Sequence, residues 1–137
     1  MSRISSYCEK NGLDAGRVTE LVFGLCEDFM PKARGYTGYI AEITDTSLIC
    51  TSDHFKARTE IPFESFSEAT FGIGSGLLWL QCLAGGKPFV FTMPRGSWKK
   101  PAAKLLLEKI AEHITIEGQK DYDRYMGPFF WLHVLLH

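Results

Sequence analysis

The chain has 137 residues, a length that fits one domain and can bury roughly two thirds of the surface of the unfolded chain. Hydrophobic residues make up 45% of the sequence and charged residues 23%, a globular composition that argues against disorder over most of the chain. The net charge of −1 gives no overall attraction to nucleic acids, so no nucleic-acid partner is expected.

The sequence carries no signal for secretion or for a membrane span. Its first residues, MSRISSYCEKNG, lack the apolar core of a secretory signal. The longest apolar run, Pro128–Leu136, is interrupted by His133 and is far shorter than the ~20 residues that span a bilayer. No two of the four cysteines have the spacing of a redox or zinc motif, so four free thiols are expected. We therefore expect a cytoplasmic protein, with a peripheral membrane location as the alternative.

The first half of the chain is rich in strand signals. Residues 1–17 are expected to form an N-terminal arm, either as one short helix or as a loose arm. Residues 18–29 fit both a helical stripe and a strand alternation, so periodicity alone leaves their structure open. The segments after them have the β-branched and aromatic composition of strands. These segments are Tyr36–Thr44, Ser47–Thr51, Ala57–Phe63 and Ala69–Ile73.

A hairpin is predicted next. The apolar runs Leu77–Ala84 and Pro88–Met93 flank two glycines at positions 85 and 86. Two glycines between apolar runs predict a β-hairpin, because the tight turns that join paired strands need positive φ angles. The glycines of Gly72–Gly76 are expected to serve turn flexibility. They do not indicate a phosphate site, because no helix is expected to follow them.

An amphipathic helix is predicted after the last strand. Ser97 is its expected N-cap, Pro101 fits its first turn, and Gly118 is its expected end. The apolar positions have the i, i+3, i+4 spacing of one helix face. They are Ala103, Leu106, Leu107, Ile110 and Ile114.

This order of elements predicts a mainly β fold, in which six or seven antiparallel strands form a sandwich or barrel closed by the C-terminal amphipathic helix. We expect this domain to span residues 18–117. Residues 118–137 form an aromatic tail, which is expected to be helical and to pack on the domain or on a neighbouring copy.

Two segments resemble known sequence patterns. Gly38–Cys50 (GYIAEITDTSLIC) resembles the "G-x-hydrophobic-x-x-T-x-x-x-L" hairpin of GRAM and bacterial PH-like domains. Ile61–Phe66 (IPFESF) is similar to their "I-P-hydrophobic-x-x-I" segment, and the last hairpin, a tryptophan and the terminal helix follow in the same order. The resemblance covers about residues 18–114, implies a PH-like fold and favours a strand for residues 18–29.

Basic residues mark the candidate binding site. The resemblance implies basic residues around the first loop in members that bind phosphoinositides, and here Lys32 and Arg34 occupy that region. A second basic cluster surrounds a tryptophan at the junction of the last strand and the helix. It consists of Arg95, Trp98, Lys99, Lys100 and Lys104. Cations beside an indole can hold a phosphate or a carboxylate-bearing partner. The alternative is a solvated helix start with the tryptophan in the core.

The sequence gives little support for catalysis or metal binding. The four histidines have no metal-ligand spacing, and Asp53 with His54 reads better as a solvated loop. A thiol nucleophile would require Cys50 or Cys82, and both lie among apolar neighbours where a thiol is inert. We therefore expect no enzyme activity, no metal and no cofactor.

The aromatic tail is the other candidate interaction surface. Its large apolar side chains can pack on their own domain, on a neighbouring copy or on a membrane. The interaction residues expected in it are Phe129, Phe130, Trp131, Leu132 and Leu135. We thus predict a non-enzymatic binding or assembly module whose partner is another protein or a second copy. The alternative is a peripheral membrane domain that binds anionic lipid weakly through the basic cluster and the tail.

Overall fold

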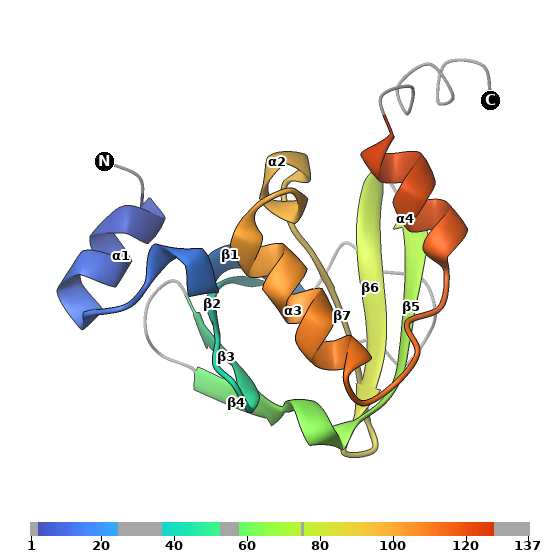
Figure 1. The fold of residues 1–137 in the computed structure, drawn as a ribbon, viewed down its shortest axis with the longest axis horizontal. Helices are drawn as coiled ribbons and strands as arrows, with labels where there is room; N and C mark the ends of the chain where they lie inside the picture. The colour runs from blue at the N-terminus through green and yellow to red at the C-terminus, as the bar shows by residue number, and fades with distance from the viewer. Residues whose placement is uncertain (1–2, 25–36, 53–57, 75, 128–137) are drawn as a thin grey trace.

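The structure is a computed structural model that describes residues 3–24, 37–52, 58–74 and 76–127. In this part of the chain seven strands form a mainly β fold, and every pair of neighbouring strands is antiparallel. The strands are β1 Val18–Gly24, β2 Thr37–Ile43, β3 Ser47–Ser52, β4 Arg58–Pro62, β5 Phe66–Gly74, β6 Leu77–Ala84 and β7 Lys87–Thr92. Their order in the sheet is β4-β3-β2-β1-β7-β6-β5 (Figure 1).

The sheet divides into a four-stranded half, β4-β3-β2-β1, and a three-stranded half, β7-β6-β5. Within the described ranges, the halves are joined only where the end of β1, Val22–Gly24, pairs with Val90–Thr92 of β7. The edge strands β4 and β5 do not pair with each other in the described residues, so the sheet is not closed into a barrel. The predicted sandwich of antiparallel strands is therefore confirmed, and its barrel form is not.

Helices surround this sheet. They are α1 Arg3–Asn11, α2 Arg95–Trp98, α3 Pro101–Ala111 and α4 Gln119–Met126, with short 3-10 turns η1 Ala15–Arg17 and η2 Phe63–Ser65. Figure 1 shows α3 lying across the sheet between its two halves, α4 alongside β5 and β6, and α1 on the opposite side of the molecule from α4. No helix in the described part of the chain is long and apolar enough to cross a membrane.

The predicted elements are largely present. Residues 18–29, whose structure the sequence left undecided, begin as the strand β1. The two glycines at 85 and 86 have φ angles of 58° and 76°, as a tight hairpin turn requires. The predicted strand at Ala69–Ile73 is longer than expected, since β5 extends from Phe66 to Gly74. The alternation of apolar and polar side chains predicts that a segment is a strand, but it does not fix the residues at which the strand begins and ends.

Two details of the predicted helix are wrong. Ser97 does not cap it: Ser97 lies in the separate helix α2, and α3 begins at Pro101 after Lys100, whose ψ of 155° is extended. A proline disfavours the helical conformation in the residue before it, so the chain leaves the helix at Lys100 and starts again. Gly118 does not end it either, because α3 stops at Ala111 and Gly118 precedes α4.

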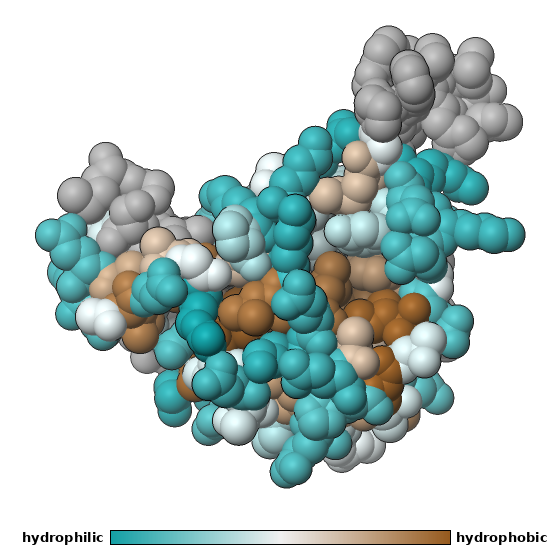
Figure 2. All heavy atoms as spheres, viewed as in Figure 1, coloured by the Kyte–Doolittle hydropathy of each residue, from teal (hydrophilic) through white to brown (hydrophobic). Residues whose placement is uncertain are grey.

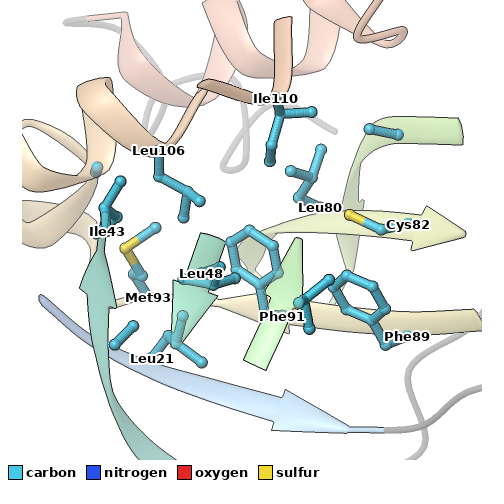
Figure 3. Packing of buried hydrophobic residues seen from close by; sticks show 14 of the residues in the cluster. Leu21, Ile43, Leu48, Leu80, Cys82, Phe89, Phe91, Met93, Leu106 and Ile110 are labelled. Atoms are coloured by element: carbon cyan, nitrogen blue, oxygen red, sulfur yellow. The ribbon is translucent and has the colours of Figure 1, made fainter. Parts of the chain in front are cut away.

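The core lies between α3 and the sheet. Leu106 and Ile110 of α3 have no exposed surface, and Figure 3 shows both pointing from the helix toward Leu80 and Ile43 of the sheet. Burying each such side chain stabilises the fold by roughly 1.5–3 kcal/mol. The predicted apolar stripe thus faces the core over its central turns, which confirms the closing helix.

Three cysteines are described, Cys8, Cys50 and Cys82, and each is a buried free thiol. Burial raises the pKa of Cys50 to about 12 and raises that of Cys82 well above its usual value, because the thiolate cannot be solvated in the core. The fourth cysteine, Cys26, lies outside the described residues.

Replacing Leu106 with alanine should lower the free energy of unfolding by about 2–5 kcal/mol, because it leaves a cavity under α3. Lys104→Ala on the exposed face of the same helix is the control and should change stability by no more than about 0.5 kcal/mol. Urea denaturation of both variants measures the difference. Equal midpoints for Leu106→Ala and the wild type would show that this side of α3 does not face the core.

Cys50 and Cys82 should resist alkylation by iodoacetamide in the folded protein, because their raised pKa values leave almost no reactive thiolate at mildly alkaline pH. Both should react fully in urea. Mass spectrometry of the tryptic peptides identifies the modified residues. Alkylation of Cys50 at the same rate in folded and unfolded protein would contradict its burial.

Candidate functional site

The predicted basic cluster does not stay together in the structure. Lys99, Lys100 and Lys104 are exposed at the start of α3. Trp98 is fully buried, and its ring packs against Phe71 and Phe91 at centroid distances of 6.0 and 6.2 Å. Its indole N–H has no acceptor in the described part of the chain, so Trp98 contributes packing to the core. A surface binding role for Trp98 is therefore wrong, and the alternative reading of a core tryptophan holds.

Arg95 has a structural position. Its Nη2 donates to the carbonyl of Gly127 at 3.2 Å, and its guanidinium lies 5.7 Å from the ring centroid of Tyr125. Tyr125 is itself buried, and the desolvation of its hydroxyl raises its pKa. Arg95 thus ties α2 to the end of α4 by a hydrogen bond and a cation–π contact.

Several predicted site residues lie outside the described residues. They are Lys32 and Arg34 of the first loop and the tail residues Phe129, Phe130, Trp131, Leu132 and Leu135. Of the predicted binding residues that the structure does describe, the three lysines alone remain together on one exposed surface.

A groove of about 600 Å³ lies between α3 and α4. We call it the apolar groove, because five of its residues are large hydrophobic or aromatic side chains: Phe71, Leu107, Ile114, Ile116 and Tyr122. Its remaining residues are Lys104, Glu108, Ala111, Thr115 and Gln119. In Figure 2, brown side chains are visible at the surface between α3 and α4, framed by teal polar side chains.

Most of the apolar side chains that line the apolar groove are only partly buried. Leu107, Ile114, Ile116 and Tyr122 are half-buried, so each keeps apolar surface in contact with water. Leu107 and Ile114 belong to the stripe that the sequence assigned to the core. They face the groove because α4 packs on the sheet and leaves this flank of α3 uncovered.

The segment between α3 and α4 sets the shape of the apolar groove. Glu117 pairs with the edge of β5: its N–H donates to the carbonyl of Ala69, and its carbonyl accepts from the N–H of Phe71, both at 2.9 Å. Gly118 then has a φ of 80°, a conformation that favours glycine, and it turns the chain into α4. The ring of Tyr122 on α4 reaches Phe71 at a centroid distance of 4.9 Å.

Sequence reasoning missed the apolar groove. Its lining residues come from β5, from α3, from the segment between α3 and α4, and from α4, so no local pattern contains it. One signal was available in the sequence. Leu107, Ile114 and Ile116 add apolar side chains beside those of Leu106 and Ile110, more than a single helix face can bury against one sheet.

A second groove, of about 520 Å³, lies on the other flank of α3 beside η1. Its charges are mixed, with Arg17, Lys99 and Lys104 facing Asp14 and Glu108. We call it the mixed-charge groove. Arg17 is also paired, because its Nη1 donates to Oδ1 of Asp45 at 3.0 Å, and this bond lowers the pKa of the Asp45 carboxyl. Charges of both signs at such short range give no strong preference for an anion.

Other candidate chemistry has no assembled site. In the described residues, no three histidine, cysteine or acidic side chains come together as metal ligands. The glycine-rich stretch ends β5, where Trp79 Nε1 donates to the carbonyl of Gly74 at 2.9 Å, so it forms a hairpin end. Cys50 and Cys82 lie in the core, away from solvent.

Comparison with known proteins gives no family. No family model matches the chain, and no curated protein matches it. Among solved structures, the chain is similar to Inner Membrane Complex Sub-compartment Protein 3 from Toxoplasma gondii, with a TM-score of 0.47 and 10% sequence identity. The match covers 70% of this chain and 76% of that one. A likeness at this level carries no inference about function.

Gly118→Ala should destabilise the protein more than Gly76→Ala. Both glycines have positive φ angles, 80° and 75°, so an alanine costs about 1–2 kcal/mol at either position. At Gly118 the added Cβ would also lie 2.9 Å from the backbone nitrogen of Phe71 and collide with its carbonyl oxygen, whereas Gly76 has open space. Urea denaturation compares the two variants. Equal losses would show that the contact between residue 118 and β5 is not tight.

Proposed function

We propose that this protein is a non-enzymatic binding or assembly module with a PH-like fold, and that its apolar groove holds an apolar segment of a protein partner. The observation that carries the proposal is the row of half-buried apolar side chains between α3 and α4. The order of strands followed by a closing helix supports the PH-like part of the proposal, together with the resemblance of Gly38–Cys50 to that superfamily.

An apolar groove between two helices suits a helix or an extended peptide. A partner that places two or three large side chains against Leu107, Ile114 and Ile116 removes their remaining apolar surface from water. Each buried side chain of the partner adds roughly 1.5–3 kcal/mol of favourable transfer energy. Specific recognition by proteins commonly combines such an apolar centre with a polar rim.

Charges at the rim indicate the polarity of the partner. Lys104 lines the apolar groove, one turn before Glu108, and Lys100 lies exposed at the same end of α3, whereas Lys99 lines the mixed-charge groove. A partner with a carboxylate at the lysine end of its apolar segment would complement this rim. Exposed charge pairs of this kind guide association more than they add affinity.

The three exposed lysines also favour the alternative of anionic lipid binding. That alternative receives less support from the site than the protein partner does. Trp98, which would have inserted beside the lysines, is buried in the core, and Arg95 is engaged with Gly127 and Tyr125.

The proposal is tested by selecting peptides from a random display library on the immobilised full chain. The selected peptides should be apolar with an acidic end, and Leu107→Asp should weaken their binding by at least about tenfold, since tenfold corresponds to only ~1.4 kcal/mol. Leu105→Asp is the matched control. Leu105 is half-buried on the same helix but lines the mixed-charge groove, so this variant should bind normally.

Two outcomes would contradict the proposal. Selected peptides that bind Leu107→Asp as well as the wild type would place the binding site elsewhere. Failure to select any peptide, combined with sedimentation on phosphatidylserine vesicles that is lost at high salt, would favour the lipid alternative, because headgroup attraction is screened by salt.

A further inference from the structure

We infer that the partner segment binds in extended form, as a β-strand added to the edge of the three-stranded half beside the apolar groove. This inference rests on the proposed function and deepens it, because it specifies the backbone form and the side-chain pattern of the partner. Three observations carry it: two backbone groups that point outward from the edge, an apolar side chain on one face of the edge, and a carboxylate on the other face.

The segment between α3 and α4 pairs with β5 through one residue, Glu117. Its N–H donates to the carbonyl of Ala69, and its carbonyl accepts from the N–H of Phe71, both at 2.9 Å. Every peptide bond in the described residues is trans, so each peptide points its N–H and its carbonyl in opposite directions. The carbonyl of Ile116 and the N–H of Gly118 therefore point away from β5.

These two outward groups, the Ile116 carbonyl and the Gly118 N–H, have no hydrogen-bond partner in the described part of the chain. Thr115 and Glu117 beside them are exposed, so this edge is accessible to a strand. Figure 1 shows the segment running beside β5 before it enters α4. One residue of an added strand can donate to the carbonyl and accept from the N–H, just as Glu117 bonds to two residues of β5.

The two outward groups favour a strand over a helix. A helix satisfies its own backbone groups with internal hydrogen bonds, so a helical partner would leave the Ile116 carbonyl and the Gly118 N–H without a bond from its backbone. An extended partner supplies a backbone donor and a backbone acceptor at the spacing that this edge presents. The backbone of the edge thus decides between the two forms of partner that the shape of the apolar groove allows.

The two faces of the edge differ in chemistry. Glu117 lies opposite Thr70, and Thr70 is on the face of β5 opposite to the buried Phe71. Since neighbours across a strand pair share a face, Glu117 points to the outer face and Ile116 to the groove face. The burial agrees, because Glu117 is exposed and Ile116 lines the apolar groove. Side chains of an added strand would alternate between these two faces.

Charge complementarity specifies the residues of the partner on the outer face. Glu68, two residues before Thr70 on β5, is exposed on the same face as Glu117. Neither carboxylate makes an ion pair in the described residues. Opposite charges on neighbouring strands stabilise a sheet and like charges destabilise it. The partner strand therefore carries lysine or arginine on this face and large apolar side chains at the alternate positions, toward the groove.

Two peptide display libraries of equal amino-acid composition test the form of the partner. One alternates apolar and polar positions as a strand does, and the other places its apolar positions at helical spacing. Both are selected on the immobilised full chain. The alternating library should give the binders, with lysine or arginine enriched at polar positions, and Leu107→Asp should weaken their binding.

The outcomes separate the inference from the proposed function. Helix-patterned peptides that bind as tightly as the alternating ones, and that Leu107→Asp weakens, would overturn the inference and leave the proposed function standing. Absence of binders from both libraries, or binders that Leu107→Asp does not affect, would overturn both.

Backbone methylation of a selected peptide tests the added strand directly. Each peptide nitrogen is methylated in turn, and binding is measured by fluorescence polarisation. Loss of the bond to the Ile116 carbonyl should weaken binding by roughly three- to tenfold, while methylation of either neighbouring residue should have little effect, because its N–H points away from the edge. Equal effects at successive positions would overturn the inference.

A charge reversal at Glu117 tests the outer face. Glu117→Lys should weaken the selected peptide by about threefold at low salt, and replacing the lysine of the peptide by glutamate should restore binding to this variant. Glu64→Lys, at an exposed carboxylate on η2, is the matched control and should bind the original peptide normally. Unchanged binding by Glu117→Lys would show that the partner does not pass this residue and would overturn the inference.

Discussion

A sheet that bends without closing leaves an apolar face that another element has to cover, and in this protein the cover is α3. Leu106 and Ile110 occupy the space between the two halves of the sheet and have no exposed surface. In the described residues the two halves are paired directly only at the end of β1, and α3 packs in one core with residues of both halves. With α3 in this position, each of its two flanks forms one wall of a groove.

The two grooves differ because different elements face α3 on its two sides. On one side η1 and its N-cap bring Asp14 and Arg17, and the charge of Arg17 is paired with Asp45. On the other side the segment at Glu117 is hydrogen-bonded to the edge of β5, and this pairing carries α4 onto the sheet and away from α3. The apolar groove is thus a consequence of where the chain pairs after α3 ends.

The fold was readable from the sequence where the signal was local. The alternation within strands, the two glycines at 85 and 86 and the spacing of Leu106 and Ile110 each depend on residues close in sequence. The site was not readable, because its parts come from β5, α3 and α4. The same limit explains the misplacement of Trp98: its basic neighbours suggested a surface, while its packing against Phe71 and Phe91 depends on contacts distant in sequence.

The basic residues near Trp98 also show why sequence clusters divide on folding. Arg95 lies on α2 and turns toward Tyr125 and Gly127, whereas Lys99 and Lys100 lie in the connection between α2 and α3 and are exposed. Arg95 contributes its cation to the attachment of α4, which is the wall that makes the apolar groove concave. The basic cluster of the sequence therefore divides into a structural part and an exposed part. Arg95 holds α4 in the position that forms one wall of the apolar groove, and of the three exposed lysines Lys104 lines that groove together with Glu108.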